Sequence, residues 1–549
     1  MIKTVNRFVI RNIKVPLHKT AFDYDAAAIC DARKKLSKIG FRYPVSQNSF
    51  AVYKKSVDAR KRNEIFFVYS VIFELCDSLF LDESKMQSLS DFCLKNAISP
   101  LENQPFEIVC GNVKQKQKPV VVGFGPCGMF AAYVLAKAGF CPVVIERGHD
   151  VETRTKDVYD YWKNGVLNGE SNVQFGEGGA GTFSDGKLLT RINDSLCSYV
   201  LETFYKHGAE KDILTASKPH IGTDKLREIV KNMREEIINC GGEVRFGTKL
   251  TAIHKDTCGN ITGISTDKGD ISTDTVFLAI GHSARDTFLA LMQNGITLMP
   301  KPFSVGVRIE HLQKNIDRAL YGENYENPAL PKGEYAVSKR VGERAVYSFC
   351  MCPGGTVVAS ASEDGTIVTN GMSYSARDGV NANSAIAVSI SENDYGSTVL
   401  GAIDFQRNIE KAAFCLAGSD GAAPIQNLGS FLGRTKAEIT DVLPTYTGKT
   451  ALCDISSVFP KYVNSMLAEG FLAFEKNIPG FSCDSAVLTA PETRTSSPVR
   501  IPRDADFSAL GYTGLFPCGE GAGYAGGITS AAVDGIRSAL SYIRNHKPI

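Results

Sequence analysis

A glycine-rich turn between two short apolar runs is the pattern in this sequence that most directly indicates chemistry. Residues 120–122 are followed by Gly123, Gly125 and Gly128, then by a helical pattern and a second apolar run at residues 143–145. Strand, turn, helix and strand in this order predict a dinucleotide-binding unit. Gly123 permits a tight turn, Gly125 lets the backbone approach a pyrophosphate, and Gly128 lets helix and strand pack closely. The pyrophosphate would lie at the positive end of the helix.

An acidic residue, Glu146, directly follows the second apolar run. A carboxylate at this position accepts hydrogen bonds from the hydroxyls of an adenosine ribose, and it repels a 2′-phosphate. We therefore expect a tightly held nucleotide other than NADP. This unit alone does not separate FAD from NAD, because both contain the same ADP moiety.

Two segments far downstream favour FAD. Residues 275–281 form an apolar run that ends in Gly281, a type of strand that passes close to the cofactor in flavoproteins with two dinucleotide folds. Near the C-terminus, the glycine-rich residues 519–527 precede a helical pattern over residues 530–543. A helix N-terminus directed at N1 and the C2 carbonyl of a flavin stabilises the negative charge of the reduced ring.

A third glycine-rich segment, residues 176–187, also contains G-x-G-x-x-G. It has no Val/Ile run before it and no helical pattern after it, so we do not expect a second dinucleotide fold there. We expect a loop that lies over the flavin or its pyrophosphate, with Thr182 or Ser184 hydrogen-bonded to the cofactor.

Five longer runs together resemble a known family, the bacterial uncharacterised FAD-dependent dehydrogenases. The runs are NVQFGEGGAGTFSDGKL (172–188), KPFSVGVRIEH (301–311), TNGMSYSARDGVNANSA (369–385), ETRTSSPVRIPR (492–503) and GEGAGYAGGITSAAVDG (519–535). The resemblance spans essentially the whole chain. It implies non-covalently bound FAD and a fold similar to the glutathione reductase superfamily, and it leaves the substrate open. Glu520 stands where that superfamily usually has Asp.

The motifs and the resemblance together give one set of expected FAD contacts. These are Gly123, Gly125, Pro126, Cys127, Gly128, Glu146, Arg147, Gly179, Gly181, Thr182, Ser184, Leu250, Gly281, Gly519, Glu520, Gly526, Gly527 and Ile528.

The region that covers the flavin ring in the superfamily corresponds here to roughly residues 300–500, and it supplies weaker catalytic candidates. Three arginines, Arg308, Arg377 and Arg494, either clamp an anionic substrate or form ion pairs between domains. Cys350 and Cys352 are either a redox pair beside the flavin or buried thiols, since neighbouring positions on one strand face are a poor disulfide geometry. The remaining candidates are His282, as a proton donor or a structural hydrogen-bond partner, and Tyr374.

The elements that must position these residues predict an α/β protein. The chain has 549 residues, enough for about two to four domains. We expect an N-terminal ferredoxin-like α+β domain (1–110), a linker (111–118), an FAD-binding Rossmann-like (GR2-type) domain in two segments (119–300 and 500–549) and an inserted α+β substrate or cap domain (301–499). In the first domain we expect a strand at 8–15, a helix that buries Ile29, Ala32, Leu36 and Ile39, and strands at 49–54 and 65–73.

Composition excludes several classes of protein. Apolar residues make up 43% and charged residues 22%, which is typical of a globular chain and not of a disordered one. The net charge, 61 − 59 = +2, provides no overall field for nucleic acid or anionic lipid. The 15 cysteines are scattered without metal-ligand spacing, so we expect no metal. No signal peptide or long apolar run is apparent, so we expect a cytoplasmic protein without stable membrane insertion.

Three functions remain open at this stage. The first is an oxidoreductase in which flavin N5 exchanges a hydride equivalent with a small organic substrate, with a diffusible electron acceptor or with transiently bound NAD(P)H as donor. The second is an RNA-linked flavoprotein of the tRNA-modifying type, which would bind RNA through the basic residues Lys54, Lys55, Arg60, Lys61 and Arg62. The alternative for this basic segment is a solvated hairpin loop. The third is a non-catalytic FAD-bound redox sensor.

Overall fold

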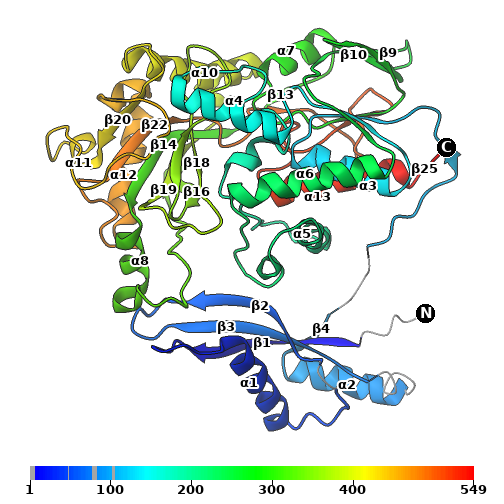
Figure 1. The fold of residues 1–549 in the computed structure, drawn as a ribbon, viewed down its shortest axis with the longest axis vertical. Coiled ribbons are helices and arrows are strands. Elements are labelled where there is room, and N and C mark those ends of the chain that lie inside the picture. The colour runs from blue at the N-terminus through cyan, green and yellow to red at the C-terminus, as the bar shows by residue number, and fades with distance from the viewer. Residues whose placement is uncertain (1–5, 47–48, 77–82, 102–105) are drawn as a thin grey trace. The chain divides into compact units, whose positions relative to one another are not determined.

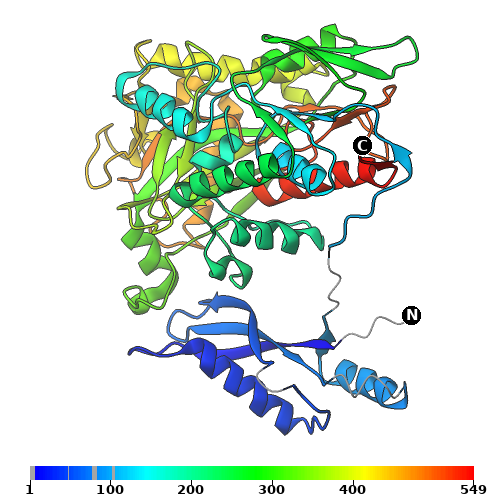
Figure 2. The ribbon, with the colours of Figure 1, turned by 45° about the vertical axis from the view of Figure 1, so that its right-hand side comes forward.

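The computed structural model describes residues 6–46, 49–76, 83–101 and 106–549, which form two compact units (Figures 1 and 2). The N-terminal unit consists of Met1–Glu107, Glu210–Pro219 and Leu320–Pro331. The main unit consists of Ile108–Ala209, His220–Ala319 and Lys332–Ile549.

The N-terminal unit has the element order β-α-β-β-α-β of a ferredoxin-like fold. Its elements are β1 (Arg7–Pro16), α1 (Tyr24–Lys38), β2 (Ala51–Asp58), β3 (Phe66–Glu74), α2 (Glu83–Lys95) and β4 (Ile98–Pro100). The four strands pair antiparallel in the order β2-β3-β1-β4. Both helices lie on one face of the sheet (Figure 2).

The helix α1 buries a slightly different face from the one that the sequence predicts. Ala28, Ala32 and Leu36 are buried, with spacings of four residues, whereas Ile29 and Ile39 are only partly buried. The small alanines let the helix approach the sheet, so the two isoleucines contact the edge of the core.

The basic segment of this unit is partly neutralised by its own neighbours. Lys54 and Lys55 lie within β2 and not in a hairpin loop, because this strand extends to Asp58. Three of the cations form ion pairs: Lys55 with Asp25, Arg60 with Asp58 and Lys61 with Glu64. These pairs lower the positive charge that the segment presents to a phosphate backbone.

A parallel sheet organises the main unit. It has the order β24-β12-β6-β7-β8, and every neighbouring pair is parallel. The strands are β6 (Val120–Val122), β7 (Val143–Ile145), β8 (Glu243–Arg245), β12 (Val276–Leu278) and β24 (Leu515–Pro517). The helices α3 (Pro126–Lys137) and α13 (Ile528–Ile543) lie side by side, and α6 (Thr223–Asn239) packs against α3 (Figure 1). In open sheets of this type, ligands bind beyond the carboxyl ends of the strands.

The buried cluster beneath this sheet joins it to the rest of the main unit. It includes Val120 and Val122 from β6, Ile264 from a three-stranded antiparallel sheet, Phe288 from α7 (Arg285–Gln293) and Ile403 from α10 (Val399–Leu416). The antiparallel sheet contains β9 (Leu250–Lys255), β10 (Ile261–Thr266) and β11 (Gly269–Ser272). The main unit also contains the helices α4 (Val151–Asn164), α5 (Leu196–Lys206) and α7 (Arg285–Gln293).

The segment expected to form the cap contains a seven-stranded sheet in the order β15-β16-β19-β14-β22-β20-β21. Its strands are β14 (Phe303–Leu312), β15 (Ser338–Val341), β16 (Arg344–Cys352), β19 (Asn381–Ile390), β20 (Ala423–Asn427), β21 (Thr450–Leu452) and β22 (Val487–Glu492). A two-stranded sheet is formed by β17 (Thr356–Ala359) and β18 (Thr369–Met372). The helices are α8 (Gln313–Tyr321), α9 (Glu392–Tyr395), α10 (Val399–Leu416), α11 (Leu428–Phe431) and α12 (Lys461–Phe474).

Two short pairings join the ends of these segments. The strands β13 (Met299–Pro300) and β23 (Val499–Arg500) pair antiparallel at the two ends of the segment expected to form the cap. The expected linker 111–118 contains β5 (Val113–Lys114), which pairs with β25 (His546–Lys547) near the C-terminus. The stretch is therefore hydrogen-bonded to the main unit over part of its length.

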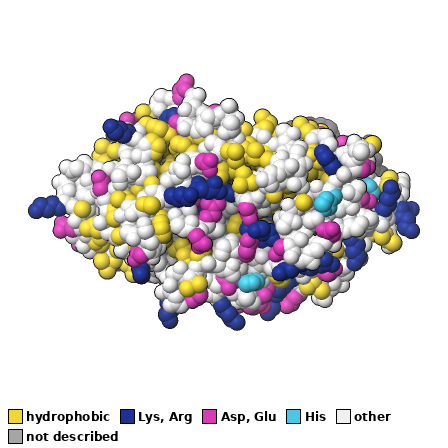
Figure 3. Space-filling model, turned by 90° about the horizontal axis from the view of Figure 1, so that it is seen from above, with side chains coloured by type: hydrophobic (Ala, Val, Ile, Leu, Met, Phe, Trp, Pro, Cys, Tyr) yellow, Lys and Arg dark blue, Asp and Glu magenta, His cyan; other side chains and the backbone are white. Residues whose placement is uncertain are grey.

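Basic and acidic side chains are interspersed on the face of the molecule that Figure 3 shows, in keeping with the small net charge. Among the described helices, none has the length and apolarity needed to cross a membrane. Within the same residues, no cluster of three or more His, Cys, Asp or Glu side chains is arranged to hold a metal ion.

Candidate functional site

A cavity of about 320 Å³ lies in the main unit, beyond the carboxyl ends of β6, β7, β12 and β24. Its lining comes from the three glycine-rich segments, from the residues after β12 and from the cap. Of the expected FAD contacts, the following line it: Gly123, Gly125, Pro126, Cys127, Glu146, Arg147, Gly179, Gly181, Ser184, Leu250, Gly281, Glu520, Gly526, Gly527 and Ile528. The topology thus brings together most of a set that is spread over four hundred residues of sequence.

The first glycine loop has the geometry that its sequence predicts. Gly123 has a φ of +96°, and a Cβ at Gly128 would collide with the carbonyl oxygen of Gly123. Gly128 therefore serves packing and does not line the cavity. At Gly125, a Cβ would lie 3.6 Å from the Cα of Gly179, which is an ordinary contact. The helix α3 begins just after Gly125, and within the described residues no side chain caps it.

The second glycine segment lies directly against the first. A Cβ at Gly179 would lie 3.0 Å from the Cα of Gly125, and the N–H of Gly178 donates to the Phe124 carbonyl at 2.8 Å. Residues 169–178 contain no strand, and the loop continues as a 3₁₀ turn, Gly179–Phe183. It is therefore an irregular lining loop and not a second dinucleotide fold, as expected.

The two hydroxyls predicted to contact the cofactor from this loop differ in position. The Thr182 side chain is buried, is not among the lining residues and donates to the Glu177 carbonyl at 3.1 Å, so a cofactor contact of its hydroxyl stays a prediction. Its hydroxyl supports the fold of the loop because a buried donor needs a partner. Ser184 does line the cavity, although its hydroxyl donates to the Gly181 carbonyl at 2.6 Å.

The third glycine segment leads into α13. The N–H of Gly519 donates to the Asp534 carboxylate at 2.7 Å, and this glycine is not among the lining residues. Gly526 and Gly527 do line it, and of the described residues none comes within 4 Å of a Cβ placed at either glycine. Gly527 precedes α13, whose N-terminus lacks a side-chain cap among these same residues. Two helices thus direct their positive ends to one cavity.

The carboxylate of Glu146 connects the first and second loops. It is buried and accepts backbone N–H groups from Phe124 at 2.7 Å, Gly148 at 3.0 Å and Gly176 at 2.9 Å. These bonds use about three of the roughly four acceptor positions of a carboxylate. In this conformation Glu146 organises the loops and has little capacity left for two ribose hydroxyls.

Arg147 is likewise engaged by protein groups at the edge of the cavity. Its guanidinium stacks on Phe175 at 4.1 Å and pairs with Glu170 at 2.7 Å and with Asp286 at 2.8 and 2.9 Å. A guanidinium held on both edges and one face is rigid. The Arg147 side chain is therefore a rigid part of the cavity lining.

The three candidate arginines of the cap all have carboxylate partners. Arg308 pairs with Glu492 at 2.9 and 2.6 Å and does not line the cavity. Arg377 pairs with Asp185 at 3.0 Å and also lies outside the lining. Arg494 lines the cavity but pairs with a buried glutamate. The geometry favours the ion-pair interpretation over a free clamp for an anionic substrate.

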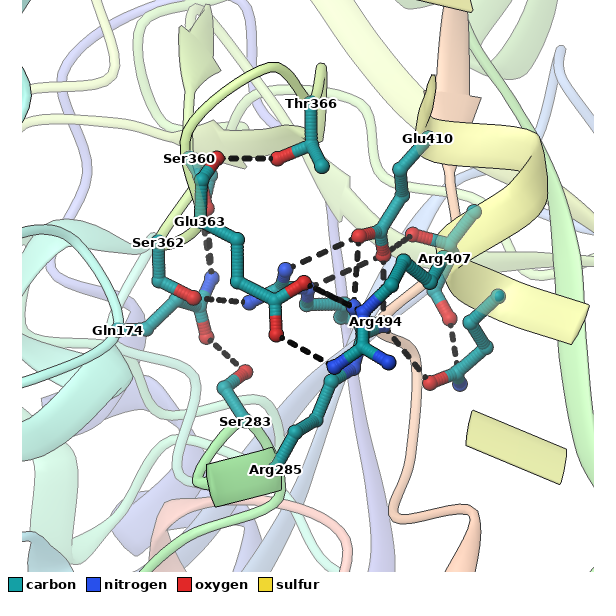
Figure 4. A network of polar contacts seen from close by, with 12 residues as sticks. Gln174, Ser283, Arg285, Ser360, Ser362, Glu363, Thr366, Arg407, Glu410 and Arg494 are labelled. Carbon is teal, nitrogen blue, oxygen red and sulfur yellow. Dashed lines mark hydrogen bonds and ion pairs between the residues drawn. The ribbon is translucent and has the colours of Figure 1, made fainter. Parts of the chain in front are cut away.

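The partner of Arg494 is Glu410, at the centre of a buried network (Figure 4). Glu410 accepts hydrogen bonds from Arg285 at 2.8 and 2.8 Å, from Arg494 at 3.2 and 3.1 Å and from the Thr493 hydroxyl at 2.6 Å. Glu363 pairs with Arg285 and with Arg407. Burial alone would raise the pKa of Glu410, but the guanidinium groups of Arg285 and Arg494 hold that pKa well below its usual value.

Sequence reasoning missed this network, although it joins the expected FAD-binding segment, through Arg285, to the cap. The residues are too far apart in the sequence to form a recognisable motif. It also missed Lys187 in the second loop, a lining residue whose buried ammonium pairs with Asp185 at 3.1 Å and with Glu334 at 3.0 Å. The only available signal for Lys187 was its place in a glycine-rich loop.

His282 lines the cavity next to this network. Its Nε2 lies 2.8 Å from the Arg494 carbonyl oxygen, and its Nδ1 lies 3.3 Å from the Ser283 hydroxyl. The backbone carbonyl therefore orients the imidazole ring. Tyr374, in contrast, is 43% exposed and does not line the cavity, so it has no place in the site.

The two cysteines occupy different environments. Cys350 lines the cavity and has a φ of +45°, whereas Cys352 is buried behind it. Positive φ is uncommon for a residue with a Cβ. The pair is therefore not part of a regular strand surface.

Comparison with known proteins places this site in a family context. Residues 302–495 match the family model described as FAD-dependent protein, C-terminal domain-like. An uncharacterized protein from Clostridium beijerinckii is 48% identical over 494 residues, which cover 89% of this chain and 91% of that protein.

Solved structures give weaker similarities. A geranylgeranyl bacteriochlorophyll reductase-like protein from Thermoplasma acidophilum is 12% identical, with 77% of this chain and 78% of that chain covered and a TM-score of 0.34. An L-amino acid deaminase from Proteus vulgaris is 11% identical, with 81% and 94% covered and a TM-score of 0.31. At these identities and TM-scores, neither similarity indicates a substrate.

Proposed function

We propose that this chain, which belongs to the same family as the Clostridium beijerinckii protein, is an FAD-dependent oxidoreductase that binds FAD non-covalently in the glycine-lined cavity. The observation that carries the proposal is that α3 and α13 both begin at this cavity, each behind glycine and each without a side-chain cap among the described residues. Such helix N-termini suit the two electron-rich parts of FAD, its pyrophosphate and the pyrimidine edge of its ring. The match of residues 302–495 to an FAD-dependent family domain supports the same cofactor.

The glycines fit this cofactor at three places. Gly125 leaves bare backbone at the start of α3, and Gly526 and Gly527 do the same before α13. A Cβ at Gly281 would also meet no atom of the described residues within 4 Å. Backbone without side chains allows close approach of a long, flat ligand along these segments.

The proposed chemistry is transfer of a hydride equivalent between a small organic substrate and the flavin. Bound FAD supplies a two-electron acceptor at N5. The chain orients it with the two helix N-termini. The Arg494 carbonyl accepts from the Nε2–H of His282, so Nδ1, beside the Ser283 hydroxyl, is the ring atom that would exchange a proton with a substrate in the cavity. A diffusible molecule accepts the electrons, or NAD(P)H donates them in a transient encounter.

Anaerobic reduction tests this chemistry. Reconstituted protein is mixed, without oxygen, with a panel of small amino acids, hydroxy acids, amines and alcohols and separately with NADH and NADPH. We expect at least one compound to bleach the visible flavin band at a rate that saturates with its concentration. His282→Asn, which keeps a hydrogen-bonding side chain, should slow that bleaching with little change in FAD affinity. No bleaching by any compound, with dithionite still reducing the flavin, would count against an oxidoreductase.

A further inference from the structure

We infer that Cys350 and Cys352 form a dithiol–disulfide couple that reduces small organic disulfides, with Cys350 as the attacking thiol. This activity goes beyond the proposed flavin chemistry and does not require it. Cys350 lines the cavity from the cap side, next to Phe349, whereas Cys352 is fully buried. A ligand in the cavity therefore reaches Cys350 first, and Cys352 can be reached only through it.

The backbone brings these two residues out of regular strand geometry. In the pairing of β16 with β19, Phe349 lies opposite Ala385 and Cys352 lies opposite Asn383, so β16 has one extra residue. A bulge of this kind bends a strand and redirects a side chain, often beside an active site. Here it coincides with the φ of +45° at Cys350. The objection to a disulfide between neighbouring positions on one strand face assumes a regular strand, and the bulge interrupts that regularity between Phe349 and Cys352.

The thiols are close to each other. The Cys352 thiol donates a hydrogen bond to the Cys350 carbonyl oxygen, with its Sγ at 3.3 Å from that oxygen. The buried guanidinium of Arg308 binds that same carbonyl oxygen at 3.1 Å, and its Nη1 lies 4.0 Å from the Cys352 sulfur. Arg308 therefore fixes the bulge, and its guanidinium, which is paired on its other side with Glu492, lies next to the Cys352 sulfur.

The charges around the pair assign different roles to the two thiols. The neighbouring Cys352 thiol, with the cations of Arg308 and Lys187, lowers the pKa of Cys350 to about 7, against the opposing effects of burial and of Asp185. The neighbouring Cys350 thiol, together with burial, raises the pKa of Cys352 well above its usual value. Cys350 is thus the thiolate nucleophile near neutral pH, and Cys352 stays protonated until it resolves the intermediate.

The reaction is two successive thiol–disulfide exchanges. The Cys350 thiolate attacks one sulfur of the small disulfide, the disulfide bond breaks, and one small thiolate leaves and takes up a proton. Cys352 then loses its proton and attacks the Cys350 sulfur of the mixed disulfide, which expels the second small thiolate. The two cysteines together lose two electrons and two protons, and the small disulfide gains both to become two thiols.

Peptide mapping tests the couple, because trypsin releases residues 345–377 as one peptide whose only cysteines are Cys350 and Cys352. The full-length protein, with its flavin content recorded, is treated with 2-hydroxyethyl disulfide, and the remaining thiols are blocked with N-ethylmaleimide. The protein is then digested with trypsin, and the masses of the peptides are measured. In the wild type we expect this peptide to lose two hydrogens and to react with no maleimide. In Cys352→Ser we expect a mixed disulfide on Cys350, and in Cys350→Ser we expect Cys352 to remain a thiol.

The pH dependence gives a second readout that needs no variant. The thiolate forms as pH rises through the pKa, so the oxidation rate of peptide 345–377 should rise to half its maximum near pH 7. The exposed Cys258 and Cys415 provide internal controls in the same digests, because their peptides show whether the reagent reacts with accessible thiols of this protein.

Two results would overturn the inference. One is a wild-type peptide 345–377 that stays reduced while the peptides of Cys258 and Cys415 react. The other is a mixed disulfide on Cys350 in the wild type that never converts to the internal disulfide. Because the readout is the mass of a peptide and not the flavin spectrum, failure of FAD binding would leave this test interpretable.

Discussion

Replacement of Glu410 by glutamine should lower the free energy of unfolding of the main unit by about 3–5 kcal/mol, the usual cost of breaking a buried ion pair. The Glu410 carboxylate is fully buried and contacts the guanidinium groups of both Arg285 and Arg494. An amide of the same shape keeps the packing but removes the carboxylate partner of buried Arg494 and leaves buried Arg285 paired with Glu363 alone. Urea unfolding followed by tryptophan fluorescence measures the loss.

Trp162 makes this measurement specific to the main unit. It is the single tryptophan of the chain, it is buried in α4, and its indole N–H donates to the Ala359 carbonyl at 2.8 Å. Its emission therefore reports on packing between α4 and the cap. Both proteins should be compared without flavin, so that ligand binding does not contribute to stability.

The matched control is Glu469→Gln on the exposed face of α12. A surface change of this kind should alter stability by less than about 0.5 kcal/mol.

Because the native pKa of Glu410 is depressed, its ionic contribution is present above the unfolded-state pKa of about 4.5 and is lost as pH falls below it. The difference in the free energy of unfolding between the wild type and Glu410→Gln should thus become smaller in acid. Equal stability of the two glutamine variants at neutral pH would contradict the assigned role of the network.

Replacement of Gly125 by alanine should weaken FAD binding at least tenfold, or about 1.4 kcal/mol, while the flavin-free protein stays folded. Gly125 has φ and ψ of −75° and −177°, which any residue adopts, and its added methyl would meet only an ordinary contact at 3.6 Å from Gly179. The methyl group would occupy space that the pyrophosphate needs at the start of α3. Titration of flavin-free protein with FAD, followed by quenching of flavin fluorescence, gives the dissociation constant.

Gly128→Ala is the informative comparison for this variant. Its Cβ would collide with the Gly123 carbonyl oxygen, so both stability and FAD affinity should fall. Gly125→Ala should cost no more than about 1 kcal/mol of stability, the scale of a helix N-cap change. If Gly125→Ala binds FAD as tightly as the wild type, the pyrophosphate does not lie at α3.

The sequence predicted the features that depend on local pattern. Short Val/Ile runs such as 120–122 alternate with helical patterns, and this order produced the parallel sheet and placed the first glycine loop at its carboxyl edge. Gly526 and Gly527 could be found because a glycine pair before an apolar helix marks a helix start. These signals are short-range, so they survive in a single sequence.

The features that escaped prediction depend on long-range contacts. Glu146 was read as a ribose ligand, but Phe124, Gly148 and Gly176 converge on it only after folding. Thr182 was expected at the cofactor, yet the 3₁₀ turn rotates its hydroxyl toward a buried carbonyl. The bulge at Cys350 arises from its pairing register with β19, which no pattern in β16 reveals.

The cofactor content of the purified protein tests the central claim most directly. The protein is purified, reconstituted with an excess of FAD and freed of unbound flavin, and then denatured so that the released compounds can be identified by mass and quantified per chain. The structure predicts one FAD per chain, released intact because it is not covalently attached. Release of no FAD, or of NAD or NADP in its place, would contradict the assignment of the glycine-lined cavity.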